Sequence, residues 1–416
     1  MKSILEFLES KRGGILIKCI LLLTAFLIGL LLPSPFSRME YGHVTSSDEE
    51  LSDTINMVLE NGVYTGSIVN GTKIRHGDGR FEMTDGSIYM GEWKKDALPY
   101  GKKQTRYSIY TGEFDEELRN HGFGIIEYNE DYFRKKREDG FSDVNIVAKY
   151  IGNWVRDNKS GLGRAIMKDE SMQFGIYSNG LLQSVEGAHY RIGGCVYGID
   201  ASHHQQDIDW NQLAIYCDEN GRACEDTPAN QAYMQPVFFV YLKATEGATE
   251  RDDKYRDRKD DAKKHGIVQG SYHILRLLTS SIDDQLENFF ATAIWVSGDL
   301  PPALDIEFEK EIEIVISNYG KETFYTMILK WLKEVEKKYG VKPIIYTNES
   351  IRNNYLQDDR LKGYDVWIAK YGNKPQNFDW HFWQMTEKGQ IRGNKGYIDI
   401  NLYKGDYTSF MEYVNR

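Results

Sequence analysis

Three patterns along the 416-residue chain predict an α/β protein: an irregular (β/α) barrel preceded by a β-hairpin repeat array and one N-terminal transmembrane helix. They are a long apolar run near the N-terminus, a recurring aromatic–glycine unit, and an alternation of apolar strands with amphipathic helices. These patterns divide the chain into a short cytoplasmic stub (1–12), the transmembrane segment (13–33), a linker (34–60), the hairpin array (61–186) and the barrel (194–416).

The composition is that of a globular protein with two or three domains. Hydrophobic residues make up 41% and charged residues 27% of the chain. The formal net charge of −11 argues against binding to nucleic acid, which requires a basic surface. The 28 tyrosines, 18 phenylalanines and 8 tryptophans suit stacking on sugar rings, but they also suit the core of a β-rich repeat protein.

The apolar run "GGILIKCILLLTAFLIGLLL" (residues 13–32) is long enough to cross a bilayer as a helix. Its one charge, Lys18, lies near an end, where the long side chain reaches the interface. Lys2, Lys11 and Arg12 precede the run and the acidic stretch "SSDEE" follows it. This asymmetry predicts an uncleaved, single-pass anchor in the cytoplasmic (inner) membrane, with everything after it periplasmic or extracellular. The alternatives are a cleaved signal peptide, although no small-x-small site follows, and a buried soluble helix.

The cysteines leave one question open. Cys217 and Cys224 are close enough in "CDENGRAC" to form a disulfide in an oxidising compartment, and two separate thiols are an equal alternative. No Cys/His group has the spacing of a metal site, so no structural metal is predicted.

The repeat unit is an aromatic residue, a glycine two positions on, and another large residue. It reads "YTGSI" at 64, "YMGEW" at 89, "YTGEF" at 110 and "YIGNW" at 150, with a weaker copy "QFGIY" at 173. "HGDG", "HGFG" and "SGLG" lie between copies. Such units predict β-hairpins that bury their aromatic faces against one another. The pattern resembles the MORN repeat, which implies either a rigid spacer or a docking surface for a protein or lipid partner.

The region from about residue 194 alternates strands and helices, which predicts a parallel barrel. In "LPPALDIEFE" (300–309), an extended strand places Asp305 and Glu307 on the same face. Two close carboxylates repel each other, so one tends to stay protonated, as a general acid requires. The alternatives are a solvated strand face and an edge strand protected by charge.

The other predicted strands also end in polar or aromatic residues, where barrel enzymes gather their chemistry. These candidates are Asp200, Lys243, Tyr272, His273, Tyr346, Trp367, Trp383, Gln384, Asp399 and Asn401.

The segments "YGIDASHHQQDIDW", "FVYLKATEG", "GSYHILR", "LPPALDIE", "PIIYTN", "VWIAKY" and "FWQMTEKGQIRGNKGYIDINLY" resemble glycoside hydrolase family 25, the Chalaropsis-type lysozymes. The resemblance extends in order from 194 to about 410. It implies an irregular β/α barrel that cleaves the β-1,4 bond between N-acetylmuramic acid and N-acetylglucosamine in peptidoglycan, with no cofactor. Two features depart from the family: Gln206 where glycine is common, and a long connection from Leu213 to Pro236.

The resemblance also implies roles for these residues. Glu307 would be the general acid and then the base, and Asp305 would orient the substrate's acetamido group. Asp200 and Asp399 would stabilise the developing positive charge. The remaining candidates would bind the glycan: Lys243, Tyr272, His273, Tyr346, Trp367, Trp383, Gln384 and Asn401. The competing interpretations are a non-catalytic peptidoglycan-binding scaffold whose repeats recruit a partner, and a hydrolase of another N-acetylglucosamine polymer such as chitin.

Overall fold

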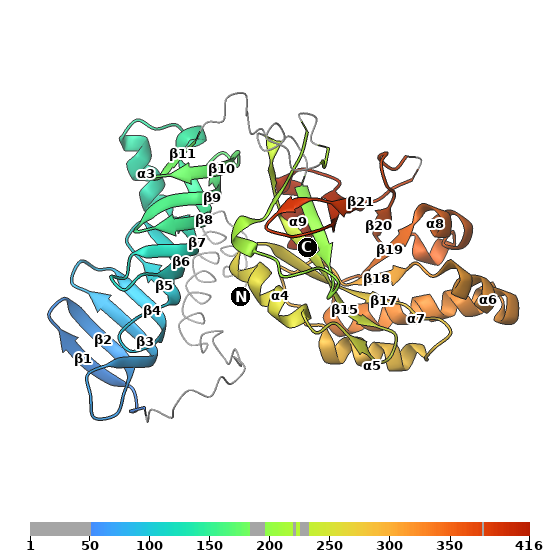
Figure 1. Ribbon diagram of the computed structural model, residues 1–416, viewed down its shortest axis with the longest axis horizontal. Helices are drawn as coiled ribbons and strands as arrows, with labels where there is room; N and C mark the ends of the chain where they lie inside the picture. The colour runs from blue at the N-terminus through green and yellow to red at the C-terminus, as the bar shows by residue number, and fades with distance from the viewer. Residues whose placement is uncertain (1–50, 184–195, 219–221, 225–232, 377) are drawn as a thin grey trace, which may run out of the picture. The chain divides into compact units, whose positions relative to one another are not determined.

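The computed structural model describes residues 51–183, 196–218, 222–224, 233–376 and 378–416 (Figure 1). The predicted stub and transmembrane segment therefore lie outside the described residues. Within the described part of the chain, no helix is both long enough and apolar enough to cross a membrane.

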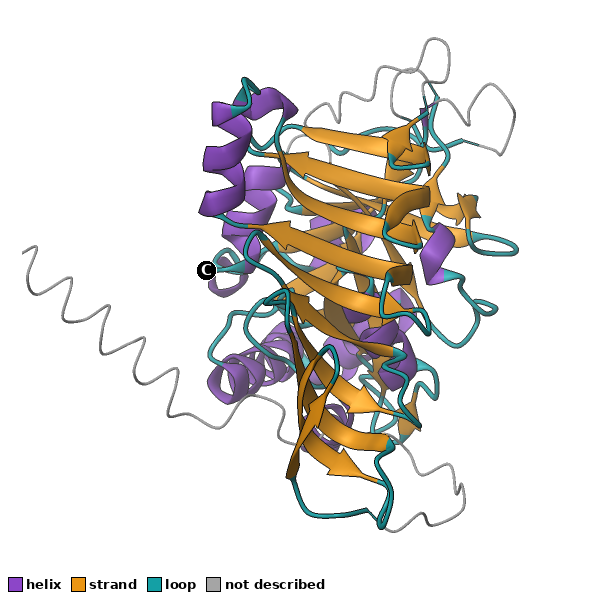
Figure 2. Ribbon diagram, turned by 90° about the vertical axis from the view of Figure 1, so that its left-hand side faces the viewer, coloured by secondary structure: helices purple, strands orange, loops and turns teal. Residues whose placement is uncertain are grey.

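Residues 55–182 form an eleven-stranded antiparallel sheet in which each strand pairs with the next along the chain (Figure 2). Helix α3 (Glu130–Glu138) follows the seventh strand. The strands are β1 (Ile55–Leu59), β2 (Gly62–Ile68), β3 (Arg75–Met83), β4 (Ile88–Trp93), β5 (Tyr100–Gln104), β6 (Ser108–Phe114), β7 (Asn120–Tyr128), β8 (Val147–Val155), β9 (Asn158–Met167), β10 (Met172–Ser178) and β11 (Leu181–Leu182).

The predicted linker (34–60) is wrong at its C-terminal end, because β1 lies within it. Strand β1 pairs with β2 in register, with Val58 opposite Val63 and Leu59 opposite Gly62. The turn between them consists of Glu60 and Asn61.

The repeat unit has a steric explanation. The tyrosine ring of one strand covers the second glycine of the "HGxG" or "SGLG" segment in the next strand. A Cβ built on Gly79, Gly124 or Gly163 would lie 2.2 Å from the hydroxyl of Tyr64, Tyr110 or Tyr150, respectively. The glycine is therefore required by the close approach of the ring.

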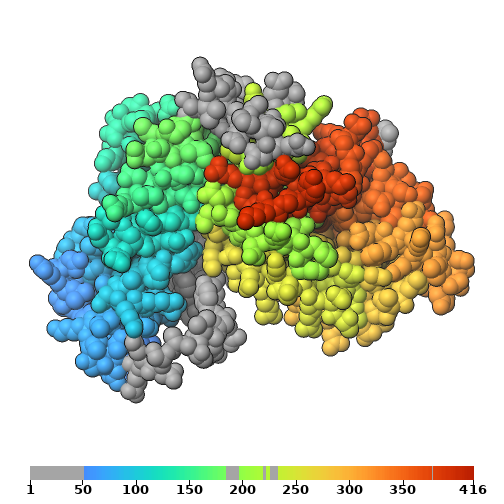
Figure 3. Space-filling view, viewed as in Figure 1, coloured from blue at the N-terminus to red at the C-terminus, as the bar shows by residue number. Residues whose placement is uncertain are grey.

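Residues 196–403 contain a closed barrel of seven parallel strands and one antiparallel strand, as predicted for the fold class. The strands are β12 (Val196–Ala201), β15 (Phe239–Glu246), β17 (Val268–Ile274), β18 (Ala303–Ile306), β19 (Ile344–Asn348), β20 (Val366–Ala369), β21 (Phe382–Gly389) and β23 (Ile398–Tyr403). Strand β12 pairs with both β15 and the antiparallel β23, which closes the barrel. On the surface, C-terminal residues (red) correspondingly lie against residues that begin the barrel (yellow-green; Figure 3).

Helices connect the barrel strands, and short strands extend the loops. The helices are α4 (Tyr255–Lys264), α5 (Ile282–Thr292), α6 (Glu309–Tyr319), α7 (Lys321–Tyr339), α8 (Glu349–Tyr355) and α9 (Tyr407–Val414). The long connection from Leu213 to Pro236 contains β13 (Ala214–Ile215) and β14 (Gln235–Pro236), and β13 also pairs with β22 (Ile391–Arg392). Cys217 is buried and Cys224 is half-buried, and in the described part of the chain the structure has no disulfide between them, which corresponds to the alternative of two separate thiols.

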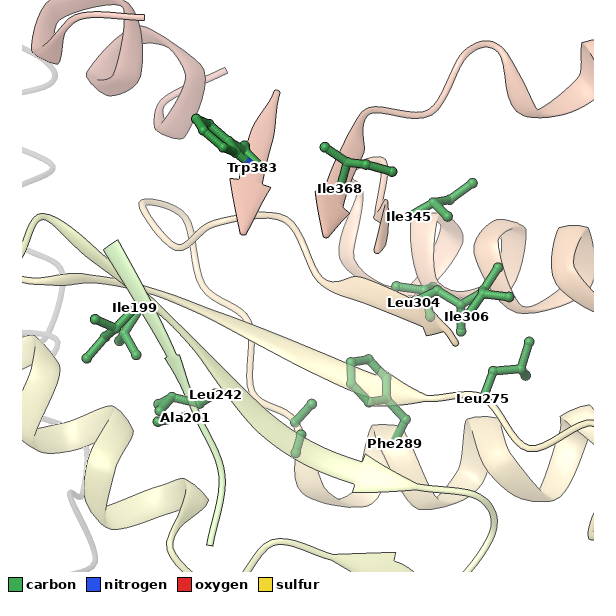
Figure 4. Packing of buried hydrophobic residues seen from close by; sticks show 14 of the residues in the cluster. Ile199, Ala201, Leu242, Leu275, Phe289, Leu304, Ile306, Ile345, Ile368 and Trp383 are labelled. Carbon is green, nitrogen blue, oxygen red and sulfur yellow. The ribbon is translucent and has the colours of Figure 1, made fainter. Parts of the chain in front are cut away.

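Alternation along each strand creates two apolar layers. Side chains on the outer face, such as Ile199, Leu304 and Ile368, pack with helix residues such as Phe289 (Figure 4). Side chains on the inner face, such as Tyr241 and Phe382, fill the barrel interior. Residues next to each other in a strand therefore face different environments.

Candidate active site

Three carboxyl groups meet at one end of the barrel because of strand direction. Asp200 is near the C-terminal end of β12 and Asp305 is near that of β18, and parallel strands end at the same edge. Strand β23 runs the opposite way, so its second residue, Asp399, is at this edge too. The register places Asp399 directly opposite Asp200.

Asp200 is held by two buried amide groups. The side-chain amide of Gln384 donates to Asp200 Oδ2 at 2.9 Å, and that of Asn401 donates to the same oxygen at 2.7 Å. The amide oxygens are occupied in turn: Tyr346 Oη donates to Gln384 Oε1 at 2.9 Å, and Trp367 Nε1 donates to Asn401 Oδ1 at 2.7 Å. Two chains of hydrogen bonds therefore end on one oxygen of Asp200, one starting at Tyr346 and the other at Trp367.

Asp200 and Asp399 are a buried carboxyl pair whose pKa values are both raised. Burial raises the pKa of Asp399 to about 9, and the neighbouring Asp200 contributes to this rise. Burial also raises the pKa of Asp200, while the amides of Asn401 and Gln384 oppose that rise. Because these donors stabilise a negative charge on Asp200, we assign the proton to Asp399 and the charge to Asp200 at neutral pH.

Asp305 and Glu307 share the same end of the barrel. Asp305 is buried within β18, whereas Glu307 is the first residue after this strand and is exposed. Burial raises the pKa of Asp305 well above its usual value, and the charge of Glu307 raises it further. Although the Glu307 residue as a whole is exposed, neighbouring atoms desolvate its carboxyl group and so raise its pKa, and the charge of Glu246 raises it further. Among the described residues, none forms a hydrogen bond with Asp305 Oδ1.

A cavity of about 400 Å³ opens beside Glu307. It lies over the ends of β19 and β20 and the start of α8. Its lining is Glu307, Tyr346, Asn348, Glu349, Ser350, Ala369, Lys370 and Tyr371. Carboxyl, hydroxyl and amide groups with an exposed tyrosine are suited to a polyhydroxylated ligand.

The structure brings most of the predicted site residues into or beneath this end of the barrel. The polar interior group consists of Asp200, Lys243, Tyr272, Asp305, Tyr346, Trp367, Gln384, Asp399 and Asn401. Trp367 differs from its predicted role, because it is only 2% exposed and stacks on Tyr241 at 4.5 Å. It supports Asn401 from below and offers no face to a sugar.

His273 and Trp383 are wrong as predicted glycan-binding residues, since both point to the outer face. His273 is fully buried, stacks on Trp331 and donates from Nε2 to Gln285 Oε1 at 3.0 Å. Burial lowers its pKa to about 4, so it is a neutral core histidine. Trp383 packs in the outer layer (Figure 4) and donates to the Lys370 carbonyl at 2.7 Å.

The sequence interpretation missed four cavity residues that follow strand ends: Glu349, Ser350, Lys370 and Tyr371. Tyr371 is 51% exposed and lies two residues after β20. Lys370 precedes it and pairs with Glu349 at 2.8 Å. The signal was present in "VWIAKYG" and "IIYTNE", where polar residues continue past the last strand position.

Comparison with known proteins assigns the barrel to an enzyme class. Residues 199–394 match the family described as glycosyl hydrolases family 25. The chain is 29% identical over 224 residues to the uncharacterized protein YegX of Escherichia coli strain K12, covering 53% of this chain and 74% of that protein. It is 28% identical over 234 residues to lysozyme M1 of Streptomyces globisporus, covering 53% and 71%. A solved family 25 glycosyl hydrolase from Bacillus anthracis is 25% identical, with a TM-score of 0.43, over 56% of this chain and 99% of that chain.

The family match makes the protein a glycoside hydrolase. The matched residues include Asp200, Asp305 and Glu307, and Asp399 lies five residues beyond them.

Proposed function

We propose that this glycoside hydrolase cleaves the β-1,4 bond between N-acetylmuramic acid and N-acetylglucosamine in peptidoglycan by general acid/base catalysis. The observation that carries the proposal is Glu307, a carboxyl group with a raised pKa that lines a cavity above three further carboxyls. The similarity to lysozyme M1 supports the choice of substrate.

In the proposed reaction, protonated Glu307 gives its proton to the glycosidic oxygen as the bond breaks. The carboxylate that remains takes a proton from the attacking water. The raised pKa keeps Glu307 protonated to a higher pH than an ordinary glutamate.

The other carboxyls prepare the sugar. Asp305 Oδ1 has no hydrogen-bond partner among the described residues, so it is available to the acetamido N–H of the substrate. Asp200 keeps a negative charge fixed by two amide donors, and this charge stabilises the oxocarbenium-like transition state.

The proposal also covers the rest of the chain. The apolar residues 13–33 anchor the protein as a single pass in the cytoplasmic membrane, with the barrel outside it. The hairpin sheet is an array of MORN repeats that serves as a spacer and offers a surface to a protein or lipid partner. The same tyrosine–glycine contact occurs in three pairs of neighbouring strands, β2 with β3, β6 with β7 and β8 with β9, and this recurrence supports the repeat assignment. Such tethering would restrict hydrolysis to the glycan near the membrane.

The test compares the full-length protein with its Glu307→Gln variant on purified peptidoglycan and on chitin. New reducing ends are identified by mass spectrometry, and Glu309→Gln serves as a matched control two residues away. We expect muramic acid ends from the wild type and the control, and none from Glu307→Gln. Binding without cleavage would favour the scaffold, and cleavage of chitin alone would favour a different polymer.

A further inference from the structure

A four-residue ionic bridge lies beside Glu307 and joins three elements. At the end of β15, Lys243 Nζ donates to Glu246 Oε2 at 2.7 Å. Arg276, two residues after β17, donates from Nη1 to Glu246 Oε1 at 2.9 Å. On its other side Arg276 donates to Glu311 Oε1, from Nε at 2.9 Å and from Nη2 at 2.7 Å. Lys243 is therefore engaged with a protein carboxylate and is not a free glycan-binding cation.

The bridge holds the backbone that carries Glu307. Glu311 is in the first turn of α6, which begins two residues after Glu307, and its Oε2 accepts the N–H of Leu277 at 2.7 Å. The guanidinium of Arg276 also lies 4.3 Å from the ring centroid of Phe308, the residue next to Glu307. Arg276 thus contacts the segment on the C-terminal side of Glu307 through both an ion pair and a ring.

The bridge is also electrically balanced. Two cations, Lys243 and Arg276, offset two carboxylates, Glu246 and Glu311. The other ionisable groups that face Glu307 are Asp200 on β12, Asp305 on β18, Asp399 on β23, Tyr346 on β19, and Glu349, Lys370 and Tyr371 across the cavity. Of these groups Asp200 keeps a negative charge in a buried setting, so the charge of Arg276 acts more strongly here than on an ordinary surface.

We propose that Arg276 is a positioning residue for hydrolysis: it fixes the turn that carries Glu307 and offsets the negative charge of Glu246 and Glu311. The inference rests on the proposed function, in which Glu307 is the acid. Arg276 and Lys243 lower the pKa of Glu307 while Glu246 raises it, in agreement with this assignment.

The proposal predicts opposite effects for two variants. Arg276→Gln leaves the bridge with one uncompensated carboxylate, so the midpoint of the Glu307 titration should rise by about 0.5 pH unit or more. Glu246→Gln leaves an excess of positive charge, so the midpoint should fall by a similar amount. Arg276→Lys keeps the charge but loses the two-sided fork; it should leave the midpoint near the wild-type value and reduce kcat several-fold.

The measurement is a ¹³C-carboxyl NMR titration of the full-length protein, with the Glu307 signal assigned by its loss in Glu307→Gln. The pH profile of kcat/KM is recorded beside it. Arg256→Gln, which removes a cation from the exposed face of α4, is the matched control. If Arg276→Gln does not fold, as judged by thermal unfolding, Glu246→Gln and Arg276→Lys decide the outcome.

Shifts in the same direction for Arg276→Gln and Glu246→Gln, or no shift in either, would overturn the charge-offsetting role. Full kcat in Arg276→Lys would overturn the positioning role. Because the titration does not require turnover, an inactive wild type would contradict the proposed function without deciding this inference.

Discussion

The hairpin sheet and the barrel both rely on tyrosine and tryptophan, but their hydrogen bonds end in different places. In the sheet, Tyr64, Tyr110 and Tyr150 each donate to a backbone carbonyl three residues later, on Ser67, Glu113 and Asn153. In the barrel, the hydrogen bond of Trp367 leads to Asn401 and that of Tyr346 to Gln384, and both amides end on Asp200.

The difference separates aromatic residues that build a fold from those that support a site. Bonds that close within one repeat satisfy a buried hydroxyl and add stability only. Bonds that cross the barrel and meet at a carboxylate fix the position and charge of that carboxylate in the candidate site. The aromatic excess of the sequence therefore has two explanations, and the end of each hydrogen bond tells them apart.

Asn401→Ala tests this difference most severely. The variant leaves the Trp367 N–H without its acceptor and removes a donor from Asp200. We expect kcat/KM on peptidoglycan to fall about 100-fold, with a loss of about 2–3 kcal/mol in the free energy of unfolding. Steady-state kinetics and urea unfolding measure the two effects.

Tyr110→Phe is the matched variant in the sheet. It removes the hydroxyl that donates to the backbone carbonyls of Glu113 and, more weakly, His121, and it should cost about 1 kcal/mol of stability with kcat/KM unchanged. An equal loss of activity in both variants would contradict the distinction.

Gly124→Ala tests whether the close approach of the Tyr110 ring is the reason for glycine at this position of the sheet. The new Cβ would lie 2.2 Å from the Tyr110 hydroxyl and 2.4 Å from its ring, so the ring must move. We expect a cost of about 2–3 kcal/mol, measured by urea unfolding, with normal kcat/KM in the folded fraction.

The control for this variant is Gly86→Ala, where the backbone φ is 84° and the added Cβ meets nothing within 4 Å. It should cost about 1 kcal/mol, because only the backbone conformation is disfavoured. Similar losses in the two variants would show that ring contact is not the reason for the glycine.

Asp399→Asn has the smallest expected effect, and that effect depends on pH. The pKa of Asp399 is raised from 3.8 to about 9, so between these values the folded state binds more protons than the unfolded state. The wild type therefore loses stability as pH rises through this window, and the variant does not. At pH 8 the free energy of unfolding of the variant should exceed that of the wild type by at least about 1 kcal/mol, which corresponds to about 2–4 °C in Tm.

Differential scanning fluorimetry from pH 5 to pH 9 follows this change. Asp283→Asn, an exposed carboxylate on α5, should show a Tm difference from the wild type that does not grow with pH. A difference for Asp399→Asn that stays flat or reverses would rule out the assignment of the proton to Asp399.

The sequence was sufficient for the barrel and for the acids at its strand ends, because those depend on local alternation and strand direction. The same alternation rule could have removed two errors. Tyr272 and His273 are neighbours in one strand, as are Trp383 and Gln384, so only one of each pair can face the interior. In both pairs the outward residue is the one that packs beneath the helices.

The remaining site features depend on contacts between distant segments. The bridge from Glu246 through Arg276 to Glu311 joins residues 30 and 35 positions apart, and no local pattern marks it. Likewise, the sequence predicts that Trp367 stacks on a sugar ring. Only the packing of Tyr241 against its indole ring shows that it is buried.

The central claim, that Glu307 is the general acid, is tested most directly by varying the leaving group. The values of kcat/KM for the wild type and Glu307→Gln would be compared on peptidoglycan and on a 2,4-dinitrophenyl β-glycoside of the muramic acid disaccharide, whose leaving group needs no proton. We predict a loss of about 10³-fold on peptidoglycan and no more than about 10-fold on the activated glycoside. Equal losses on both substrates would contradict the assignment of Glu307 as the acid.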